Sequence, residues 1–361
     1  DTEQNIMKSD FNRRDFLKAI SVLGAASTIE LYKPEILRVL AQAEQGEVSV
    51  VWLQGAGCTG CTISLIQGVN PDLIDAITRF RLAIDFHPTI MVPTGDAAMK
   101  VLEDIKTGAR PLDVFIFEGA VSKGNYCTVG EIGGKPVPVE DWVLELGKRA
   151  TYTLAFGTCS SYGGIPSGSP NPTQCRSVSE VLSGRTVINV PGCPPHPDWM
   201  LLTISAALMK YPIPLDEEGR PTFFFNDYIH DRCPRRGYYD NLQFAKEPSE
   251  DLCLYELGCR GPLNKSDCPS RFWNSGLNWC IGANAPCIGC CSKGFPDPLF
   301  SPFYESVGPV GVPVEALRVT ARREALTGTE VNAAIIAAVA AGAGIAALTL
   351  NKALRGKKVT K

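Results

Sequence analysis

Apolar and polar positions follow two different periods along residues 46–210. Short apolar runs rich in β-branched and aromatic residues predict strands at 48–53, 82–86, 114–117, 151–156 and 186–190. Helical spacing of apolar residues between them predicts helices at 63–68, 72–80, 99–107, 142–148 and 198–210. Strands that alternate with helices form a parallel sheet with helices on both faces. The pattern therefore predicts an α/β domain over residues 46–210.

The periodic pattern ends near residue 210. From 211 to about 304 the chain is rich in Pro, Gly, Asn, Trp and Cys and has few periodic runs. A segment that cannot build its own core often depends on metal sites for its structure. We therefore expect a loop-rich second domain over 211–310, followed by a linker over 311–330.

Residues 331–350 form a run without a charged side chain. About twenty such residues are enough for a helix to cross a bilayer, and small residues such as Gly342 and Gly344 allow close helix packing. Five cations lie in the tail, 351–361: Lys352, Arg355, Lys357, Lys358 and Lys361. Because positive residues tend to stay in the cytoplasm, we expect a transmembrane anchor with a cytoplasmic tail. The alternative is a buried Ala-rich helix of a soluble fold.

Residues 1–45 have the features of an export signal. Arg13 and Arg14 precede Phe-Leu-Lys and a modestly apolar stretch, which is typical of a twin-arginine signal. The triplet 41–43, Ala-Gln-Ala, is an A-x-A cleavage pattern. The alternative is the basic start of a helix, and Asn12 departs from the Ser or Thr usual before the arginines. We expect the body of the protein on the periplasmic side of the cytoplasmic membrane.

Cysteine is unusually frequent, at fourteen of 361 residues. The net charge of −3 and the pI near 5.8 argue against a nucleic-acid-binding protein, which usually has a basic surface. Fourteen cysteines indicate disulfides, zinc, iron–sulfur clusters or redox thiols. A chain of this length can build a core and does not need many disulfides. The spacing of the cysteines must decide among these classes.

Cysteines follow three of the predicted strands. Cys58 and Cys61 follow the first strand, Cys159 the fourth and Cys193 the fifth. Since parallel strands end at one edge of their sheet, where ligands of such sheets bind, we expect one four-cysteine site there. Four thiolates suit either zinc or an iron–sulfur cube.

The remaining candidate ligands lie in the loop-rich region. One group is His230, Cys233, Cys253 and Cys259, and the other is Cys268, Cys280, Cys287 and Cys290. One His with three Cys is also a known zinc set. The chain has only three histidines, and His230 stands three residues before a cysteine, which favours a ligand over a structural role.

At these residues the sequence resembles the small subunit of nickel–iron hydrogenases. The similarity runs from about 48 to 298 in the family's order, and the export signal and C-terminal span resemble the membrane-attached uptake branch. The matching strings are Gly57-Cys58-Thr59-Gly60-Cys61, Glu118-Gly119-Ala120, Gly157-Thr158-Cys159, Gly192-Cys193-Pro194-Pro195, His230-x-x-Cys233-Pro234 and Pro286-Cys287-Ile288-Gly289-Cys290. The resemblance implies a flavodoxin-like first domain followed by an iron–sulfur cluster domain.

The resemblance also implies three clusters, each held by one ligand set. The proximal set would hold a [4Fe–4S] cluster with Cys58, Cys61, Cys159 and Cys193. The distal set would hold a [4Fe–4S] cluster with His230, Cys233, Cys253 and Cys259. The medial set is Cys268, Cys280, Cys287 and Cys290. Many members of the family have proline in place of Cys280 and a [3Fe–4S] medial cluster. The fourth thiolate here predicts a medial [4Fe–4S] cluster of lower potential, since cluster type and net charge set the potential.

Other positions complete the expected site. Oxygen-tolerant relatives carry two extra cysteines near the proximal cluster, where this chain has Gly60 and Gly164, so we expect oxygen sensitivity. Glu118 ends the third predicted strand on the cysteine-bearing edge and is either a proximal-site carboxylate or a solvated one. We expect Cys127 and Cys175 to be small buried side chains. Cys291 is an alternative ligand, and we expect His196 and Trp199 to be packing residues.

The reaction implied by the resemblance is the reversible conversion of dihydrogen into two protons and two electrons. The nickel–iron centre would lie in a separate large subunit, so this chain would transfer electrons and hold no catalytic residue of its own. Its partners would be that subunit, a membrane cytochrome b or other quinone-linked protein, and the lipid bilayer. Three alternatives are a cluster subunit of another membrane oxidoreductase of the complex I type, a hydrogen sensor, and an exported structural protein with zinc or disulfides.

Overall fold

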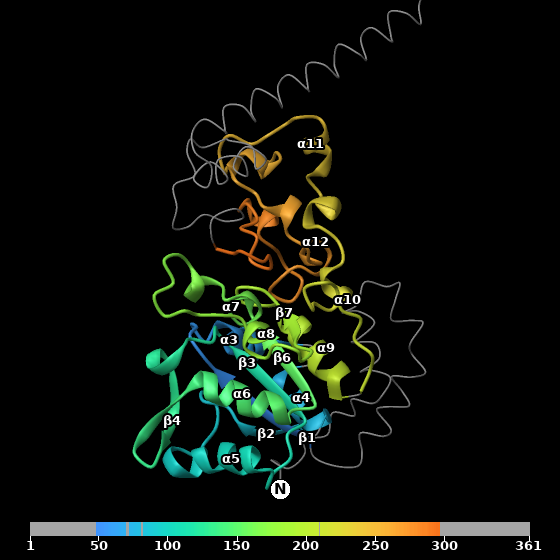
Figure 1. Ribbon diagram of the computed structural model, residues 1–361. Coiled ribbons are helices and arrows are strands. Elements are labelled where there is room, and N and C mark those ends of the chain that lie inside the picture. The colour runs from blue at the N-terminus through green and yellow to red at the C-terminus, as the bar shows by residue number, and fades with distance from the viewer. Residues whose placement is uncertain (1–47, 70–71, 81, 209, 297–361) are drawn as a thin grey trace, which may run out of the picture. The chain divides into compact units, whose positions relative to one another are not determined.

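A parallel sheet forms the first part of the chain (Figure 1). The structure is a computed structural model, and it describes residues 48–69, 72–80, 82–208 and 210–296. Within these ranges the sheet has five strands in the order β2-β1-β3-β6-β7, which is the 2-1-3-4-5 order of flavodoxin-like sheets. The strands are β1 (Val48–Gln54), β2 (Leu82–Phe86), β3 (Val114–Glu118), β6 (Tyr152–Phe156) and β7 (Ile188–Val190). All five predicted strands are confirmed.

Side chains of each central strand alternate between two buried faces. Along β1, Val50 and Trp52 pack in one core, while Val51 and Leu53 pack in the other. The first core is covered by α3 (Gly60–Ile66), α4 (Leu73–Phe80) and α9 (Pro197–Leu208). The second core is covered by α5 (Gly95–Thr107) and α6 (Val139–Arg149). Burial on both faces explains the continuous apolar runs of the strands.

Several short elements were not predicted from the sequence. They are α7 (Thr158–Tyr162), α8 (Val178–Val181), the 3-10 turns at Gly124–Tyr126 and Ile165–Ser167, and a hairpin of β4 (Thr128–Ile132) and β5 (Lys135–Pro138). Gly133 and Gly134 form the two-residue turn of the hairpin, and both have positive φ. A Gly-Gly pair is a known hairpin signal. The flanking strands are mostly exposed and lack the apolar alternation that would have revealed them.

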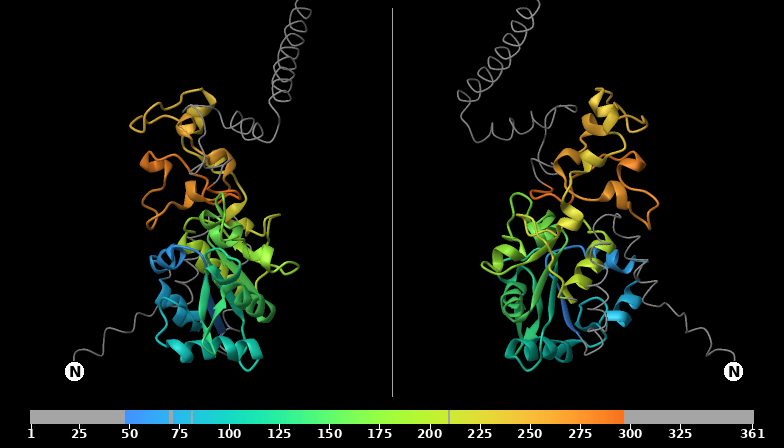
Figure 2. Two further views of the ribbon diagram at one scale, coloured as in Figure 1. Left: turned by 60° about the vertical axis from the view of Figure 1, so that its left-hand side comes forward. Right: turned by 90° about the vertical axis from the view of Figure 1, so that its right-hand side faces the viewer.

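The second part of the chain is rich in loops, as predicted. Its helices are single turns: α10 (Thr222–Phe225), α11 (Arg236–Asp240) and α12 (Cys268–Arg271). Four 3-10 turns lie at Ile229–Arg232, Leu254–Leu257, Gly261–Leu263 and Ile281–Ala283. Figures 1 and 2 show this part above the carboxyl edge of the sheet.

The loop-rich part shares a core with one face of the sheet. Phe224, Phe225 and Ile229 belong to the same buried cluster as Trp199 of α9. Polar contacts reinforce the junction, because Trp199 Nε1 donates to Asp267 at 2.8 Å. A partly buried ion pair of 3.0 Å joins Asp198 of α9 to Arg271 of α12.

Four predicted segments lie outside the described residues. They are the export signal over 1–45, the linker over 311–330, the anchor over 331–350 and the tail over 351–361. Within the ranges that the structure describes, no helix combines the length and the apolar character needed to span a bilayer.

Candidate metal centres

The proximal set gathers at the carboxyl edge of the sheet. Cys58 and Cys61 follow β1, Cys159 lies in α7 directly after β6, and Cys193 follows β7. A methyl group placed on Gly157 would lie 2.6 Å from Cys61 Sγ, so the glycine before α7 makes room for this sulfur. The four cysteines come from three loops and meet as the order of the strands predicts.

Burial and mutual repulsion act on the proximal thiols together. Burial, followed by Glu118 and then the other three cysteines, raises the pKa of Cys61 well above its usual value. Burial also raises the pKa of Cys159 to about 11 and that of Cys193 to about 12, and Cys159 adds to the shift at Cys193. Thiolates held so close need a cationic partner, and a coordinating metal deprotonates its thiol ligands. The donor set therefore fits an iron–sulfur cluster.

The distal set lines one pocket of the loop-rich part. His230, Cys233, Cys253 and Cys259 all line it, together with Arg235 and Tyr255. His230 lies in the 3-10 turn that ends just before Cys233, and a second turn follows Cys253. Burial, followed by the Arg236 charge, lowers the pKa of His230 and favours the neutral imidazole that binds metals.

The medial set lies between the other two. Cys268 begins α12, Cys280 precedes a 3-10 turn, and Cys287 and Cys290 lie in the loop that follows. Electrostatic interaction with Cys290 raises the thiol pKa of each of the other three, after the larger effect of burial, and that of Cys268 reaches about 12. Two side chains donate to the sulfurs: Ser266 Oγ to Cys268 at 3.1 Å, and Asn264 Nδ2 to Cys287 at 3.5 Å.

Disulfides and single-metal sites are two other arrangements that cysteines can form. None of the fourteen cysteines, all of which lie in the described ranges, forms a disulfide. Within those ranges, no three His, Cys, Asp or Glu side chains converge closely enough to hold a single metal ion.

Comparison with known proteins identifies the family. Residues 225–304 match the C-terminal region of NiFe/NiFeSe hydrogenase small subunits, and residues 58–207 match the 20 kDa subunit of NADH ubiquinone oxidoreductase. The periplasmic [NiFeSe] hydrogenase small subunit of Desulfomicrobium baculatum is 39% identical over 313 residues, covering 81% of this chain and 98% of that protein. The chain belongs to the family of [NiFe] hydrogenase small subunits. This assignment confirms the resemblance drawn from the sequence motifs.

Further relatives agree with the assignment. The hydrogenase-1 small chain of Escherichia coli K12 is 33% identical, and the match covers 92% of this chain and 89% of that one. A solved structure of the D. baculatum [NiFeSe] hydrogenase superposes with a TM-score of 0.67 at 40% identity, covering 72% of this chain and 99% of that chain. The complex I type match covers the sheet part alone, so the small-subunit match over the loop-rich part distinguishes the two families.

Glu118 of this small subunit is buried, so the alternative of a solvated carboxylate is wrong. It is 2% exposed and accepts hydrogen bonds from the side chains of Trp52 and Gln54 at 3.0 and 3.2 Å. It also accepts from the backbone amides of Cys61 and Thr62 at 2.8 and 3.1 Å, and from Thr62 Oγ1. The carboxylate therefore anchors the start of α3, which carries Cys61.

The cysteines outside the three sets have different surroundings. Cys175 is 3% exposed, and its sulfur lies 3.2 Å from Thr173 Oγ1, while Cys127 is half-buried against the second core. Cys291 is fully buried with its Sγ 3.9 Å from that of Cys290, whereas Cys280 is exposed. Both Cys280 and Cys291 thus remain candidates for the fourth medial ligand. His196 and Trp199 are buried and pack together against Trp273, as expected of packing residues.

Three polar residues near the ligand sets were not singled out from the sequence. Thr62 and His87 extend the network of Glu118, since Thr62 Oγ1 lies 3.4 Å from His87 Nε2. Thr158 contacts both the proximal and the medial loops. Thr158 directly precedes a cysteine at a strand-to-helix turn, and this position in the sequence could have identified it as a residue close to the ligands.

Proposed function

We propose that this chain is the electron-transfer small subunit of a membrane-bound uptake [NiFe] hydrogenase. The large subunit would oxidise dihydrogen, and the three ligand sets of this chain would hold clusters that carry the electrons outward. Iron–sulfur clusters supply one-electron carriers whose potentials depend on charge, hydrogen bonds and burial. The family assignment, the three ligand sets and their order in space all support the proposal.

The serial arrangement of the sets is the observation that carries it. Thr158, next to Cys159 of the proximal set, donates its hydroxyl to the carbonyl of Cys290 in the medial set. The amide of Arg260, next to Cys259 of the distal set, donates to the carbonyl of Cys287 in the medial set at 2.6 Å. A hydrogen bond thus joins a residue beside one set to a ligand of the next, which supports a relay with short steps.

The surface beside Cys58 is the proposed contact with the large subunit. Cys58 is exposed, and the neighbouring Ile63, Ile66 and Val69 expose 52, 44 and 53% of their surface. Exposed apolar side chains gathered beside a functional group are typical of a protein interface. An interface here would place the proximal set nearest the large subunit.

The medial and proximal clusters are proposed to be of ordinary cubic type. Cys280 offers the medial set a fourth thiolate. At the proximal site, Gly164 has φ +51°, and a methyl group there would lie 2.8 Å from the Cys159 nitrogen. A cysteine at this position would need a different backbone, which supports a simple [4Fe–4S] proximal cluster and sensitivity to oxygen.

The electron acceptor is proposed from the sequence. The apolar run over 331–350, its basic tail and the twin-arginine signal favour attachment to the cytoplasmic membrane with the body outside. A membrane cytochrome b or another quinone-linked protein would then receive electrons from the distal set.

Anaerobic purification of the tagged chain with its bound partners tests the proposal. Bleaching of the brown cluster absorbance under hydrogen, but not under argon, is the expected result. Bleaching only by a chemical reductant would keep the relay and assign it to another oxidoreductase, such as one of the complex I type. A colourless anaerobic preparation without iron would overturn the relay itself.

A further inference from the structure

Thr158 is a buried threonine at the junction between two ligand sets. It is the first residue of α7, directly before Cys159 of the proximal set, and is 1% exposed. Its hydroxyl accepts a hydrogen bond from the Gly192 amide at 2.9 Å and donates one to the Cys290 carbonyl. Its own amide donates to the Gly192 carbonyl at 2.9 Å. Thr158 is therefore hydrogen-bonded to a loop of each set.

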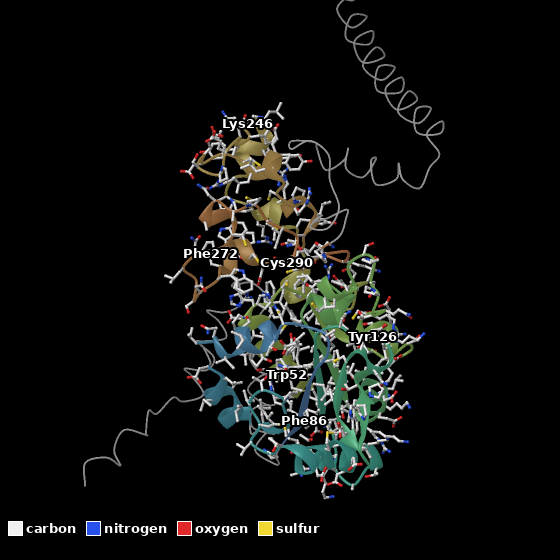
Figure 3. All side chains as sticks on the ribbon, turned by 90° about the vertical axis from the view of Figure 1, so that its left-hand side faces the viewer. Trp52, Phe86, Tyr126, Lys246, Phe272 and Cys290 are labelled. Atoms are coloured by element: carbon white, nitrogen blue, oxygen red, sulfur yellow. The ribbon has the colours of Figure 1, made fainter. Side chains whose placement is uncertain are left out.

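The partners of the hydroxyl are next to, or part of, the ligands themselves. Gly192 precedes Cys193, whose thiol interacts electrostatically with that of Cys290. Figure 3 shows Cys290 where the loop-rich part meets the sheet. The hydroxyl thus fixes the Cys193 loop on one side and the Cys290 backbone on the other. Cys193 directly follows the first of these fixed points, and Cys290 is the second.

Only a hydroxyl can make both bonds from this position. It donates and accepts at once, whereas an apolar side chain of the same shape does neither. Loss of the hydroxyl would remove a partner from a carbonyl and an amide inside a buried site, and the loops would have to shift to recover hydrogen bonds. Hydrogen bonds around ligands fix the geometry of a metal site and tune its potential.

We propose that Thr158 is a positioning residue that sets the separation of the proximal and medial ligand loops and so the rate of electron transfer between them. The inference rests on the proposed relay. In the step concerned, one electron would pass from a cluster held by the proximal set to a cluster held by the medial set, and no bond would form or break. Electron tunnelling slows steeply with distance, so a small separation of the loops has a large effect on the rate.

The test compares the hydrogenase complexes of Thr158→Val, Thr158→Ser and the unaltered chain. Iron content is measured first, and freeze-quench electron paramagnetic resonance then follows each cluster after hydrogen is added. The magnetic interaction between the reduced proximal and medial clusters is a second readout, independent of turnover. In T158V we expect full iron content, unchanged proximal reduction, a medial reduction slowed at least several-fold, and a weaker magnetic interaction. T158S keeps the hydroxyl, so its medial reduction rate and its magnetic interaction should equal those of the unaltered chain.

A matched control and a second variant keep the test decisive. Thr203 is 2% exposed and donates to the Trp199 carbonyl within α9, so Thr203→Val removes an equally buried hydroxyl without touching either set. Unchanged medial kinetics and magnetic interaction in T158V, or equal losses in T158S or T203V, would overturn the proposal. If T158V does not bind its clusters, Thr158→Ala is measured in the same way with the same expectation. Failure of hydrogen to reduce the proximal cluster of the unaltered complex would instead refute the proposed function.

Discussion

The carboxylate of Glu118 accepts hydrogen bonds from four residues, so a substitution at this position should be costly. An amide in its place would turn an NH2 group toward donors such as the Cys61 amide. A buried donor left without a partner costs about 1–3 kcal/mol. Because two of the donors are backbone amides of α3, the cost falls on the helix that carries Cys61.

Glu118→Gln should therefore weaken the proximal site more than the rest of the protein. We expect a lower unfolding midpoint and partial loss of proximal iron, measured by thermal melts and by cluster-resolved paramagnetic resonance. Glu145→Gln is the control, since Glu145 makes an exposed 3.2 Å ion pair with Lys148 on α6. Equal effects of the two substitutions would contradict an anchoring role.

Cys280 and Cys291 compete for the role of fourth medial ligand. Cys280 is exposed and interacts with Cys290, whereas Cys291 is buried beside Cys290 and also interacts with Cys268 and Cys287. Two neighbouring residues cannot easily both reach corners of one cube. We therefore expect Cys280 to be the ligand and Cys291 to be a packing residue.

Serine substitutions at the two positions separate the roles. Cys280→Ser should give the oxidised protein a [3Fe–4S] paramagnetic signal and raise the medial potential, since the cluster type changes. Cys291→Ser should leave both unchanged. If the medial signal changed only in C291S, Cys291 would be the fourth ligand and Cys280 would not.

At the scale of single elements, α3 has two functions. Its buried face packs Leu65 into the core, and its start is held by Glu118. Ile63 and Ile66, three residues apart, share an exposed side. The same short helix thus positions a ligand and presents an apolar surface beside it.

A charge on this surface should disrupt binding to the large subunit. Ile66→Asp would bury an unpaired carboxylate in the interface, and a cost of roughly 2 kcal/mol or more means about a thirtyfold weaker Kd. Copurification with the large subunit measures the effect. Ile132→Asp on the β4–β5 hairpin is the control, because Ile132 is similarly exposed, at 37%. Unimpaired copurification of I66D would place the interface elsewhere.

At the scale of the whole molecule, the sequence predicted the sheet well and the polar surroundings of the ligands poorly. Strand positions followed from apolar runs, and the convergence of Cys58, Cys159 and Cys193 followed from parallel topology. The five hydrogen bonds of Glu118 and the two roles of the Thr158 hydroxyl depend on residues distant in sequence, which periodicity cannot reveal. The loop-rich part has no repeating pattern, so only its ligands could be identified.

The two parts of the molecule also differ in what stabilises them. One face of the sheet has a core of its own, in which Phe115 and Phe117 pack against α5 and α6. Within its described residues, the loop-rich part has only single-turn helices, and it shares its core with the opposite face of the sheet. A segment of this kind gains much of its folding free energy from its metal sites.

Iron removal should therefore unfold the parts unequally. After anaerobic chelation, we expect amides over 222–291 to exchange hydrogen at nearly the rate of an unfolded chain. We expect the same of the amides in the Cys58–Cys61 loop. Amides of β3 should stay protected, because the core around Phe115 contains no ligand. Hydrogen exchange read by mass spectrometry before and after chelation measures the difference. If β3 lost protection at the same time, the shared core would make the sheet and the loops one cooperative unit. If residues 222–291 stayed fully protected, packing alone would stabilise the loops.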